Sequence, residues 1–151
     1  MAKCTFCKII CREVESPIVF EDEVSLAFLD HRPLFPGHSL LVPKNHYETL
    51  NELPAELIEP LFSNAQLMAC AVEQAMEAEG TFVAINNRIS QSVPHLHIHI
   101  VPRRKKDGLK GFFWPRNPYK DDAALLKTQR AIQQVVAQIQ NAPAPGVKKG
   151  A

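Results

Sequence analysis

The chain of 151 residues lacks an excess of charge of either sign, because 17 lysines and arginines face 16 aspartates and glutamates. A strongly basic surface would suggest nucleic acid or an anionic membrane as a partner, and the composition indicates neither. No apolar run approaches the roughly 20 residues that cross a bilayer. The first residues also lack the apolar segment of a secretory signal. We therefore expect a cytoplasmic protein that binds neither nucleic acid nor membranes.

Cysteine is scarce as well, with four in the chain. In a reducing compartment we expect free thiols rather than disulfides. Cys4 and Cys7 form a C-x-x-C pair at the very start, whereas a redox pair would normally follow a strand and open a helix. Two thiolates at this spacing reach one zinc ion, so we favour half of a zinc site. Cys70 falls in a predicted helix, where we expect a small core hydrophobe.

Histidine, in contrast, is concentrated in one place: His95, His97 and His99 alternate with apolar residues up to Ile100. Such alternation predicts a strand with an apolar core face and three imidazoles on the other face, spaced about 7 Å apart. Three interpretations compete for these imidazoles. They form a polar solvent face, a metal site, or a nucleophile with neighbours that orient it and handle protons. The spacing alone does not separate the last two.

This stretch resembles the signature of the histidine triad (HIT) superfamily, in which three histidines alternate with apolar residues. Its flanks agree too, with Gln-Ser-Val before it and Pro-Arg after it. Further blocks that resemble the family lie upstream in the same order, at residues 6–10, 20–22, 27–30 and 36–46. The resemblance covers residues 4 to about 103, and a looser similarity follows at Trp114 and Pro115.

The order of predicted elements indicates an α+β protein. A hairpin is expected over residues 18–29, then a strand at 39–42, a helix from about residue 55 that ends at Gly80, a strand at 81–85 and a terminal helix at 121–140. The resemblance implies a single HIT domain, a meandering antiparallel sheet with two main helices, usually as a homodimer. We assign it to residues 1–140, with its core at 4–103 and a Trp-containing loop and helix at 104–140. Residues 141–151 are expected to be disordered.

The resemblance also completes the zinc site. Zinc-containing bacterial members of the family combine a C-x-x-C pair with a histidine after the Pro-Lys strand and with the first triad histidine. In this chain those positions are His46 and His95. We therefore expect one structural zinc ion bound by Cys4, Cys7, His46 and His95.

The activity implied by the resemblance is nucleotidyl transfer to water at the α-phosphate of a purine nucleotide of adenosine or guanosine type. The substrate is a phosphoramidate or a dinucleoside polyphosphate, and a phosphorylase is a close relative. His97 is the expected nucleophile and His99 the proton handler. The resemblance assigns the remaining contacts to Phe6, Ile9 and Phe28 for the base, Asp30 for the ribose, Asn86, Gln91 and Ser92 for the phosphate side, and Trp114 for the partner subunit's site.

Several alternatives stay open. Asp30 could equally be a turn carboxylate that accepts backbone N–H groups. Phe6, Ile9 and Phe28 could be core residues. Trp114 could pack within its own chain. The loop at 86–90 departs from the family because Arg88 and Ser90 replace glycines and the loop is about two residues shorter. Arg88 either supplies the positive charge that attracts phosphate in this loop or is simply a solvated loop residue. Asn86 is the better match for the family's loop asparagine, and Asn87 is the alternative. A non-catalytic nucleotide-binding or zinc-stabilised interaction module is the alternative function. A zinc hydrolase using all three histidines would leave the C-x-x-C pair unexplained. His31 and His38 receive no role.

Overall fold

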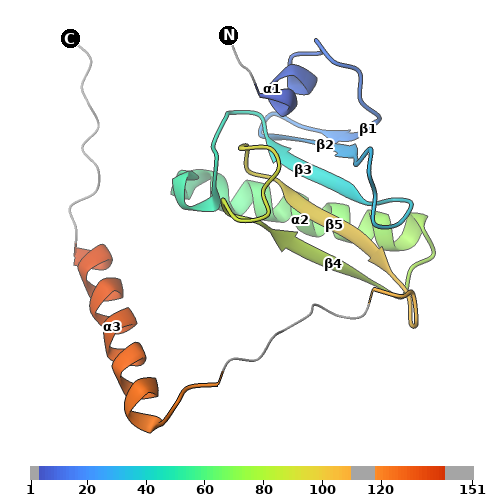
Figure 1. Ribbon diagram of the computed structural model, residues 1–151. Helices are drawn as coiled ribbons and strands as arrows, with labels where there is room; N and C mark the ends of the chain where they lie inside the picture. The colour runs from blue at the N-terminus through green and yellow to red at the C-terminus, as the bar shows by residue number, and fades with distance from the viewer. Residues whose placement is uncertain (1–3, 110–117, 142–151) are drawn as a thin grey trace, which may run out of the picture. The chain divides into compact units, whose positions relative to one another are not determined.

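The computed structural model describes residues 4–109 and 118–141. The chain divides into two compact units, residues 1–110 and 111–151. The first unit contains, in chain order, α1 (Thr5–Ile10), β1 (Ile18–Glu21), β2 (Ser25–Leu29), β3 (Ser39–Pro43), η1 (Leu50–Glu52), α2 (Ala55–Ala75), β4 (Gly80–Ile85) and β5 (Ile98–Arg103) (Figure 1). The second unit contains α3 (Asp122–Asn141).

The first unit is built on one five-stranded sheet with the order β1-β2-β3-β5-β4. All neighbouring strands are antiparallel, so the predicted α+β class with an antiparallel sheet is confirmed. β5 lies between β3 and β4, and His99 pairs with Leu40 on one side and with Ala84 on the other. The last triad histidine is thereby fixed in the middle of the sheet.

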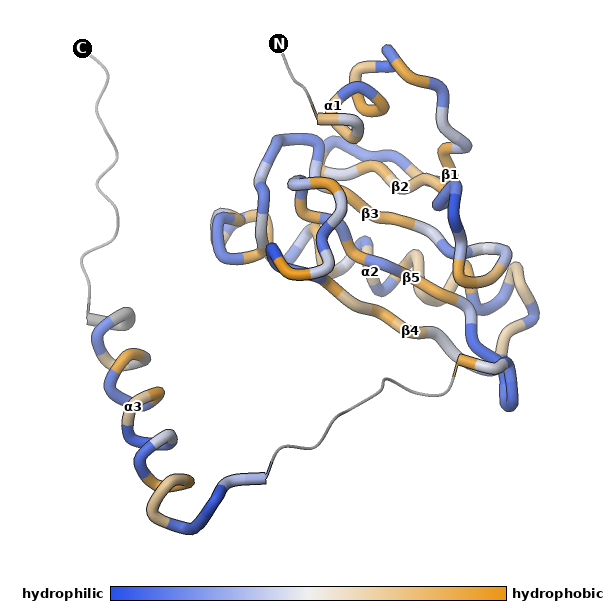
Figure 2. Tube along the Cα trace, viewed as in Figure 1, coloured by the Kyte–Doolittle hydropathy of each residue, from blue (hydrophilic) through white to orange (hydrophobic). Residues whose placement is uncertain are grey.

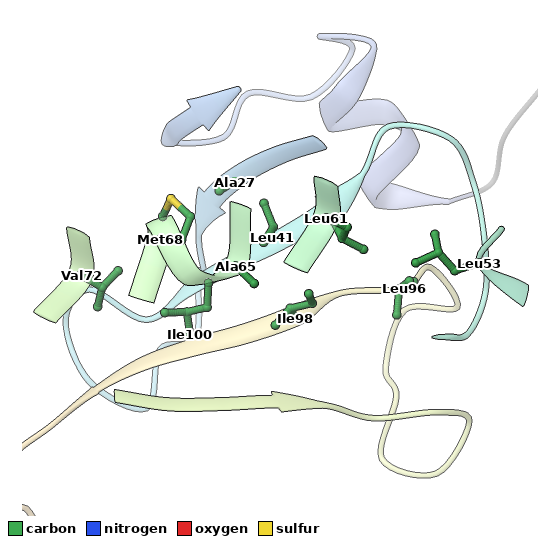
Figure 3. Packing of buried hydrophobic residues seen from close by; sticks show 10 residues of the cluster. All are labelled: Ala27, Leu41, Leu53, Leu61, Ala65, Met68, Val72, Leu96, Ile98 and Ile100. Atoms are coloured by element: carbon green, nitrogen blue, oxygen red, sulfur yellow. The ribbon is translucent and has the colours of Figure 1, made fainter. Parts of the chain in front are cut away.

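Alternating residues of the strands divide between two apolar clusters on opposite faces of the sheet. One cluster packs under α2 and contains Ala27, Leu41, Leu53, Leu61, Ala65, Met68, Val72, Leu96, Ile98 and Ile100 (Figure 3). The other cluster packs under α1 and contains Phe6, Ile9, Leu26, Phe28, Leu40 and Val42. Figure 2 shows these apolar strand residues between hydrophilic loops. The face under α1 is the one that carries the functional histidines.

The histidine stretch follows the predicted alternation, although the predicted strand is too long. β5 begins only at Ile98, because the Leu96 N–H donates to the Tyr47 carbonyl at 2.6 Å instead of joining the sheet. Leu96, Ile98 and Ile100 are nevertheless fully buried in the cluster under α2. The rings of His95 and His97 contact Phe6 in the other cluster. The separation of an apolar face from a histidine face is therefore confirmed.

The helix α2 buries one stripe at the predicted spacing, with Leu61, Ala65, Met68 and Val72 facing the sheet. Cys70 is exposed, so its expected place in the core is wrong. Position 70 lies about 200° around the helix from position 68, which turns it away from this stripe. The helix ends at Ala75, and Gly80 starts β4 instead of ending the helix.

The second unit is described only through α3 and the residues just before it. The Asp121 carboxylate accepts the Ala124 N–H at 2.8 Å and caps the start of the helix. Figure 2 shows apolar and hydrophilic positions alternating along α3. Its side chains Leu125, Leu126, Ile132 and Val135 are all exposed. Trp114 and residues 142–151 lie outside the described residues. In the part of the chain that is described, no helix combines the length and the apolar character that crossing a bilayer requires.

Candidate functional site

Two thiols and two imidazoles meet where α1 packs against the start of the histidine stretch. The Nδ1 atom of His95 lies 3.5 Å from Cys4 Sγ and 3.6 Å from Cys7 Sγ. The Nδ1 atom of His46 lies 3.3 Å from Cys7 Sγ. All four candidate ligand atoms lie within 4.8 Å of one another. The structure thus brings together the four residues that the sequence predicts as zinc ligands.

The spacing of these atoms fits a zinc ion. With Zn–S bonds of about 2.3 Å and Zn–N bonds of about 2.0–2.1 Å, tetrahedral angles place sulfur and nitrogen ligands about 3.6 Å apart. The measured distances of 3.3 to 3.6 Å lie close to this value. The outer shell agrees as well, because His95 Nε2 donates to the Pro43 carbonyl at 2.9 Å. That bond leaves the lone pair of His95 on Nδ1, facing the thiols.

The neutral His95 suits a metal ligand, whereas the thiols have to lose their protons to bind an ion. Burial and the neighbouring Cys4 together raise the pKa of the Cys7 thiol to about 11. Burial lowers the pKa of His95 to about 4, so this imidazole stays neutral. A cavity of about 570 Å³ reaches Cys4, Cys7 and His46 and also borders Ser92. This cavity gives an ion a path to the cluster, and its binding displaces the thiol protons.

His97 has its reactive nitrogen defined by the backbone. Its Nδ1 donates to the carbonyl oxygen of His95 at 2.7 Å, and only 4% of the residue is exposed. In the neutral imidazole, a proton on Nδ1 leaves the lone pair on Nε2. Phe6 packs edge-on against the ring at 5.3 Å between centroids, and the ring of His99 lies 4.8 Å away. The backbone bond and the two neighbouring rings thus hold the His97 imidazole in one orientation.

His99 is oriented by a histidine to which the sequence assigned no role. The Leu34 N–H donates to His38 Nδ1 at 3.1 Å, so the proton of the neutral His38 ring is on Nε2. His38 Nε2 lies 3.0 Å from His99 Nδ1 and donates to it. The proton of His99 is consequently on its own Nε2, which makes that atom a hydrogen-bond donor.

The surroundings keep both of these histidines neutral. Burial lowers the pKa of His99 to about 4, and the nearby His97 and His38 act in the same direction. Burial also lowers the pKa of His38, although the carboxylate of Asp30, 3.7 Å from its Nδ1, opposes this shift. At neutral pH His38 and His99 are therefore imidazoles with defined tautomers rather than imidazolium cations.

Asp30 makes the turn contact that was considered for it, and its role as a ribose ligand stays a prediction. One carboxylate oxygen accepts the Arg32 N–H at 2.9 Å, as in an ordinary turn. The other oxygen makes no hydrogen bond to a described residue and faces His38. The base-pocket candidates Phe6, Ile9 and Phe28 are all buried in the cluster under α1, with Phe6 and Phe28 edge-to-face at 5.3 Å. These three are therefore core residues beside His97, and a role in base binding stays a prediction.

The phosphate-side candidates lie on the loop between β4 and β5. Asn87 is engaged, because its Oδ1 accepts the Leu50 N–H at 2.9 Å. Asn86 is half-buried, and its side chain makes no hydrogen bond within the described residues, which leaves it the better candidate of the two.

The Gln91 amide accepts the Arg88 N–H at 2.7 Å and donates to the Glu48 carbonyl at 2.6 Å. Ser92 is exposed, and the phosphate contacts of both residues stay predictions.

The residue that sequence reasoning missed is His38. Its position after Gly37 and before an apolar strand resembles an ordinary loop end. Gly37 has φ of +93°, and a Cβ there would lie 2.6 Å from the side chain of Met76. The only signal was a histidine one residue before a strand that pairs with β5, and the register of that pairing is not visible in the local sequence.

Comparisons with known proteins agree with this geometry. Residues 11–106 match the family model of the HIT domain. An adenylylsulfatase of Arabidopsis thaliana is 39% identical over 108 residues, which cover 70% of this chain and 55% of that protein. An adenosine 5′-monophosphoramidase of Saccharomyces cerevisiae is 39% identical over 111 residues, covering 72% of this chain and 68% of that protein.

A solved structure carries a metal in a related fold. It is a zinc-bound histidine triad family protein of Mycobacterium smegmatis, with a TM-score of 0.68 and 33% identity. The alignment covers 89% of this chain and 97% of that one. Together with the cluster of Cys4, Cys7, His46 and His95, this similarity indicates a zinc site.

Proposed function

The chain belongs to the HIT family, and from this membership we propose that it is a nucleotide hydrolase that acts through a nucleotidyl-histidine intermediate. The observation that carries the proposal is the hydrogen bond from His97 Nδ1 to the His95 carbonyl, which aims the lone pair of Nε2 away from the backbone. The substrates are purine nucleotides with a good leaving group on the α-phosphate, such as nucleoside phosphoramidates and dinucleoside polyphosphates.

The reaction has two steps. His97 Nε2 attacks the α-phosphorus in line, the bond from phosphorus to the leaving group breaks, and the nucleotide is held on the imidazole. The Nε2–H of His99 hydrogen-bonds the leaving group or a phosphate oxygen and supplies the proton with which the group departs. Water then attacks the same phosphorus and gives a proton to His99 Nε2 as the bond from phosphorus to His97 Nε2 breaks, which releases the nucleoside monophosphate and restores both histidines.

The remaining site residues bind the nucleotide. Phe6, Ile9 and Phe28 form the apolar wall for the base, and the free oxygen of Asp30 accepts ribose hydroxyls. Asn86, Gln91 and Ser92 hold phosphate oxygens. This division is supported by the position of Phe6, whose ring touches His97. A zinc ion on the four-residue cluster supplies stability by fixing α1 against the histidine stretch.

The assembly proposed for the protein is a homodimer in which Trp114 reaches the partner subunit's site. The exposed apolar side chains of α3 support an intermolecular contact. Removal of residues 111–151 is expected to give a monomer in light scattering. A dimer of unchanged stability after this truncation would contradict the assignment.

The test of the function is the release of AMP from adenosine 5′-phosphoramidate by the wild type and by His97→Ala. We expect turnover by the wild type and a loss of at least about a thousandfold in His97→Ala, because the nucleophile has gone. His31→Ala is the matched control, since His31 is an exposed histidine without a role in the reaction, and its ring lies 3.7 Å from the Asp30 oxygen that the Arg32 N–H already occupies. Full turnover by His97→Ala would refute the mechanism.

The alternative is a non-catalytic nucleotide-binding or zinc-stabilised interaction module. The altered loop at 86–90 favours it, whereas the defined tautomers of His97 and His99 favour an enzyme. The same assay separates the two: AMP binding measured by calorimetry without turnover of either a phosphoramidate or a dinucleoside polyphosphate would establish the module.

A further inference from the structure

The loop between β4 and β5 begins beside the proposed nucleophile. Ile85 at the end of β4 pairs with Ile98, so the chain leaves the sheet next to His97. The loop is then fastened to the segment before α2, by Asn87 to the Leu50 N–H at 2.9 Å and by Gln91 to the Glu48 carbonyl at 2.6 Å (Figure 1). Its tip, Arg88 and Ile89, is consequently held against the segment at 48–50, three and four residues along the chain from Ile85.

The backbone of this tip is not available to a phosphate. The Arg88 N–H donates to Gln91 Oε1 at 2.7 Å, and the Ile89 N–H donates to the Asn87 carbonyl at 2.8 Å. Arg88 and Ser90 have φ of +67° and +59°, in the left-handed region that favours glycine. The loop therefore keeps a glycine-like path with bulkier residues, but the amides of Arg88 and Ile89 are used internally. At these two residues, attraction for phosphate has to come from the side chains.

The side chains at the tip form a distinct surface. The Arg88 guanidinium is 73% exposed, and its only ionic partner among the described residues is Glu52, at 3.8 Å. Ile89 next to it is 81% exposed, more than any other large apolar side chain in the described residues. Arg88, with one distant ionic partner, thus lies next to the exposed Ile89 on a loop held by hydrogen bonds.

We propose that Arg88 and Ile89 bind the leaving group and select for a nucleoside polyphosphate in that position. This inference rests on the proposed function. A guanidinium pairs with phosphate oxygens through two parallel hydrogen bonds, and an isoleucine packs on the flat face of a base. The ammonia that leaves a phosphoramidate is too small to reach either side chain. The two residues therefore determine specificity and take no part in bond breaking.

The chemistry at the α-phosphorus is the same for both substrates. With a dinucleoside tetraphosphate, the bond from His97 Nε2 to the α-phosphorus forms as the bond to the bridging oxygen breaks. The nucleoside triphosphate leaves with a proton from His99. Water then hydrolyses the nucleotidyl-histidine and returns a proton to His99, so that one nucleoside monophosphate and one nucleoside triphosphate result from one water.

The experiment compares kcat/KM for diadenosine tetraphosphate with kcat/KM for adenosine 5′-phosphoramidate. We expect Arg88→Gly to lower this ratio about tenfold, which corresponds to roughly 1.4 kcal/mol and to one charge-assisted contact. The value for the phosphoramidate should stay within about twofold. Ile89→Ala should lower the ratio by a smaller factor in the same direction.

Lys106→Gly is the matched control. Lys106 is an exposed cation with φ of +62° in the loop after β5, so glycine there removes the same charge from the same backbone conformation. Its ratio should equal that of the wild type. Arg88→Gln, which keeps a long side chain, provides a second variant if the glycine alters folding, as judged by thermal unfolding.

Three outcomes overturn the inference. An unchanged kcat/KM ratio in Arg88→Gly and Arg88→Gln would show that Arg88 does not bind the leaving group. Wild-type cleavage of the phosphoramidate without cleavage of the dinucleotide would overturn the inference and leave the proposed function intact. Cleavage of neither substrate would overturn the proposed function, and the inference with it.

Discussion

His95 and His97 are two residues apart, yet the structure gives them opposite tautomers. His95 donates from Nε2 to the Pro43 carbonyl and turns Nδ1 to the thiols of α1. His97 donates from Nδ1 to the His95 carbonyl and keeps Nε2 free. Each imidazole thus has its tautomer set by the backbone carbonyl that it meets. We call the cluster of Cys4, Cys7, His46 and His95 the metal end, after the zinc proposed for it, and His97, His99 and His38 the reaction end, after the chemistry proposed for them.

The two ends differ in how they depend on the rest of the fold. The metal end gathers ligands from α1, from the segment after β3 and from the histidine stretch, so an ion there links three parts of the chain. The reaction end depends on neutral imidazoles in a chain of hydrogen bonds from Leu34 through His38 to His99. Removing a residue from the metal end should affect folding first, and removing one from the reaction end should affect turnover first.

The largest effect is expected on the free energy of unfolding when one ligand of the metal end is removed. Cys7→Ser should lose the zinc and lower the free energy of unfolding by about 4 kcal/mol when free zinc exceeds its Kd a thousandfold. The measurements are metal content by mass spectrometry and denaturant unfolding. Cys11→Ser is the control, since Cys11 lies one helical turn away, is exposed and belongs to no cluster in the described residues.

Chelation separates stability from chemistry at this end. If the zinc is structural, activity should decline slowly and in parallel with unfolding after a chelator is added. Immediate loss of turnover in protein that is still folded would show that the metal takes part in the reaction, and the division between the two ends would be wrong.

A smaller effect is expected at the reaction end, from His38. His38→Ala removes the donor that fixes the tautomer of His99, and kcat should fall by roughly tenfold to a hundredfold, less than the loss expected for a general acid itself. His38→Gln should recover part of this loss, because an amide N–H can donate to His99 Nδ1 while its oxygen accepts the Leu34 N–H. Zinc content should not change in either variant. Equal kcat values for the two variants would contradict a positioning role.

What the sequence could predict follows the same division. The cluster of four candidate zinc ligands and the two faces of the histidine stretch were predictable, because a C-x-x-C pair, an alternation and a family resemblance are local patterns. The contact of His38 with His99 joins residues 61 apart, and it exists only through the register of β3 against β5. The start of β5 was also missed, since the hydrogen bond from Leu96 to Tyr47 is a tertiary contact that no alternation reveals.

The loop at 86–91 lies between these cases. The replacement of glycines by Arg88 and Ser90 was visible in the sequence, and the structure adds that both residues have positive φ. The partners of the Asn87 and Gln91 side chains were not predictable, because they lie in the segment at 48–50. Exposure was likewise missed for Cys70, where the helical phase and not the residue type decides.

The smallest expected effect is the contribution of His99 to the change in the free energy of unfolding at acidic pH. Burial lowers the pKa of His99 from 6.5 to about 4. Between these values the unfolded chain takes up a proton at this position that the folded chain does not, so the free energy of unfolding falls as the pH drops from about 6.5 towards 4. His99→Gln removes this contribution, which is at most about 1.4 kcal/mol per pH unit. The free energy of unfolding, measured with denaturant across this range, should therefore depend less steeply on pH in His99→Gln than in the wild type.

His31→Gln, at an exposed histidine, should match the wild type. Zinc release in acid affects all three proteins alike and cancels in the difference, so parallel curves for His99→Gln and the wild type would mean that His99 does not remain neutral in the fold.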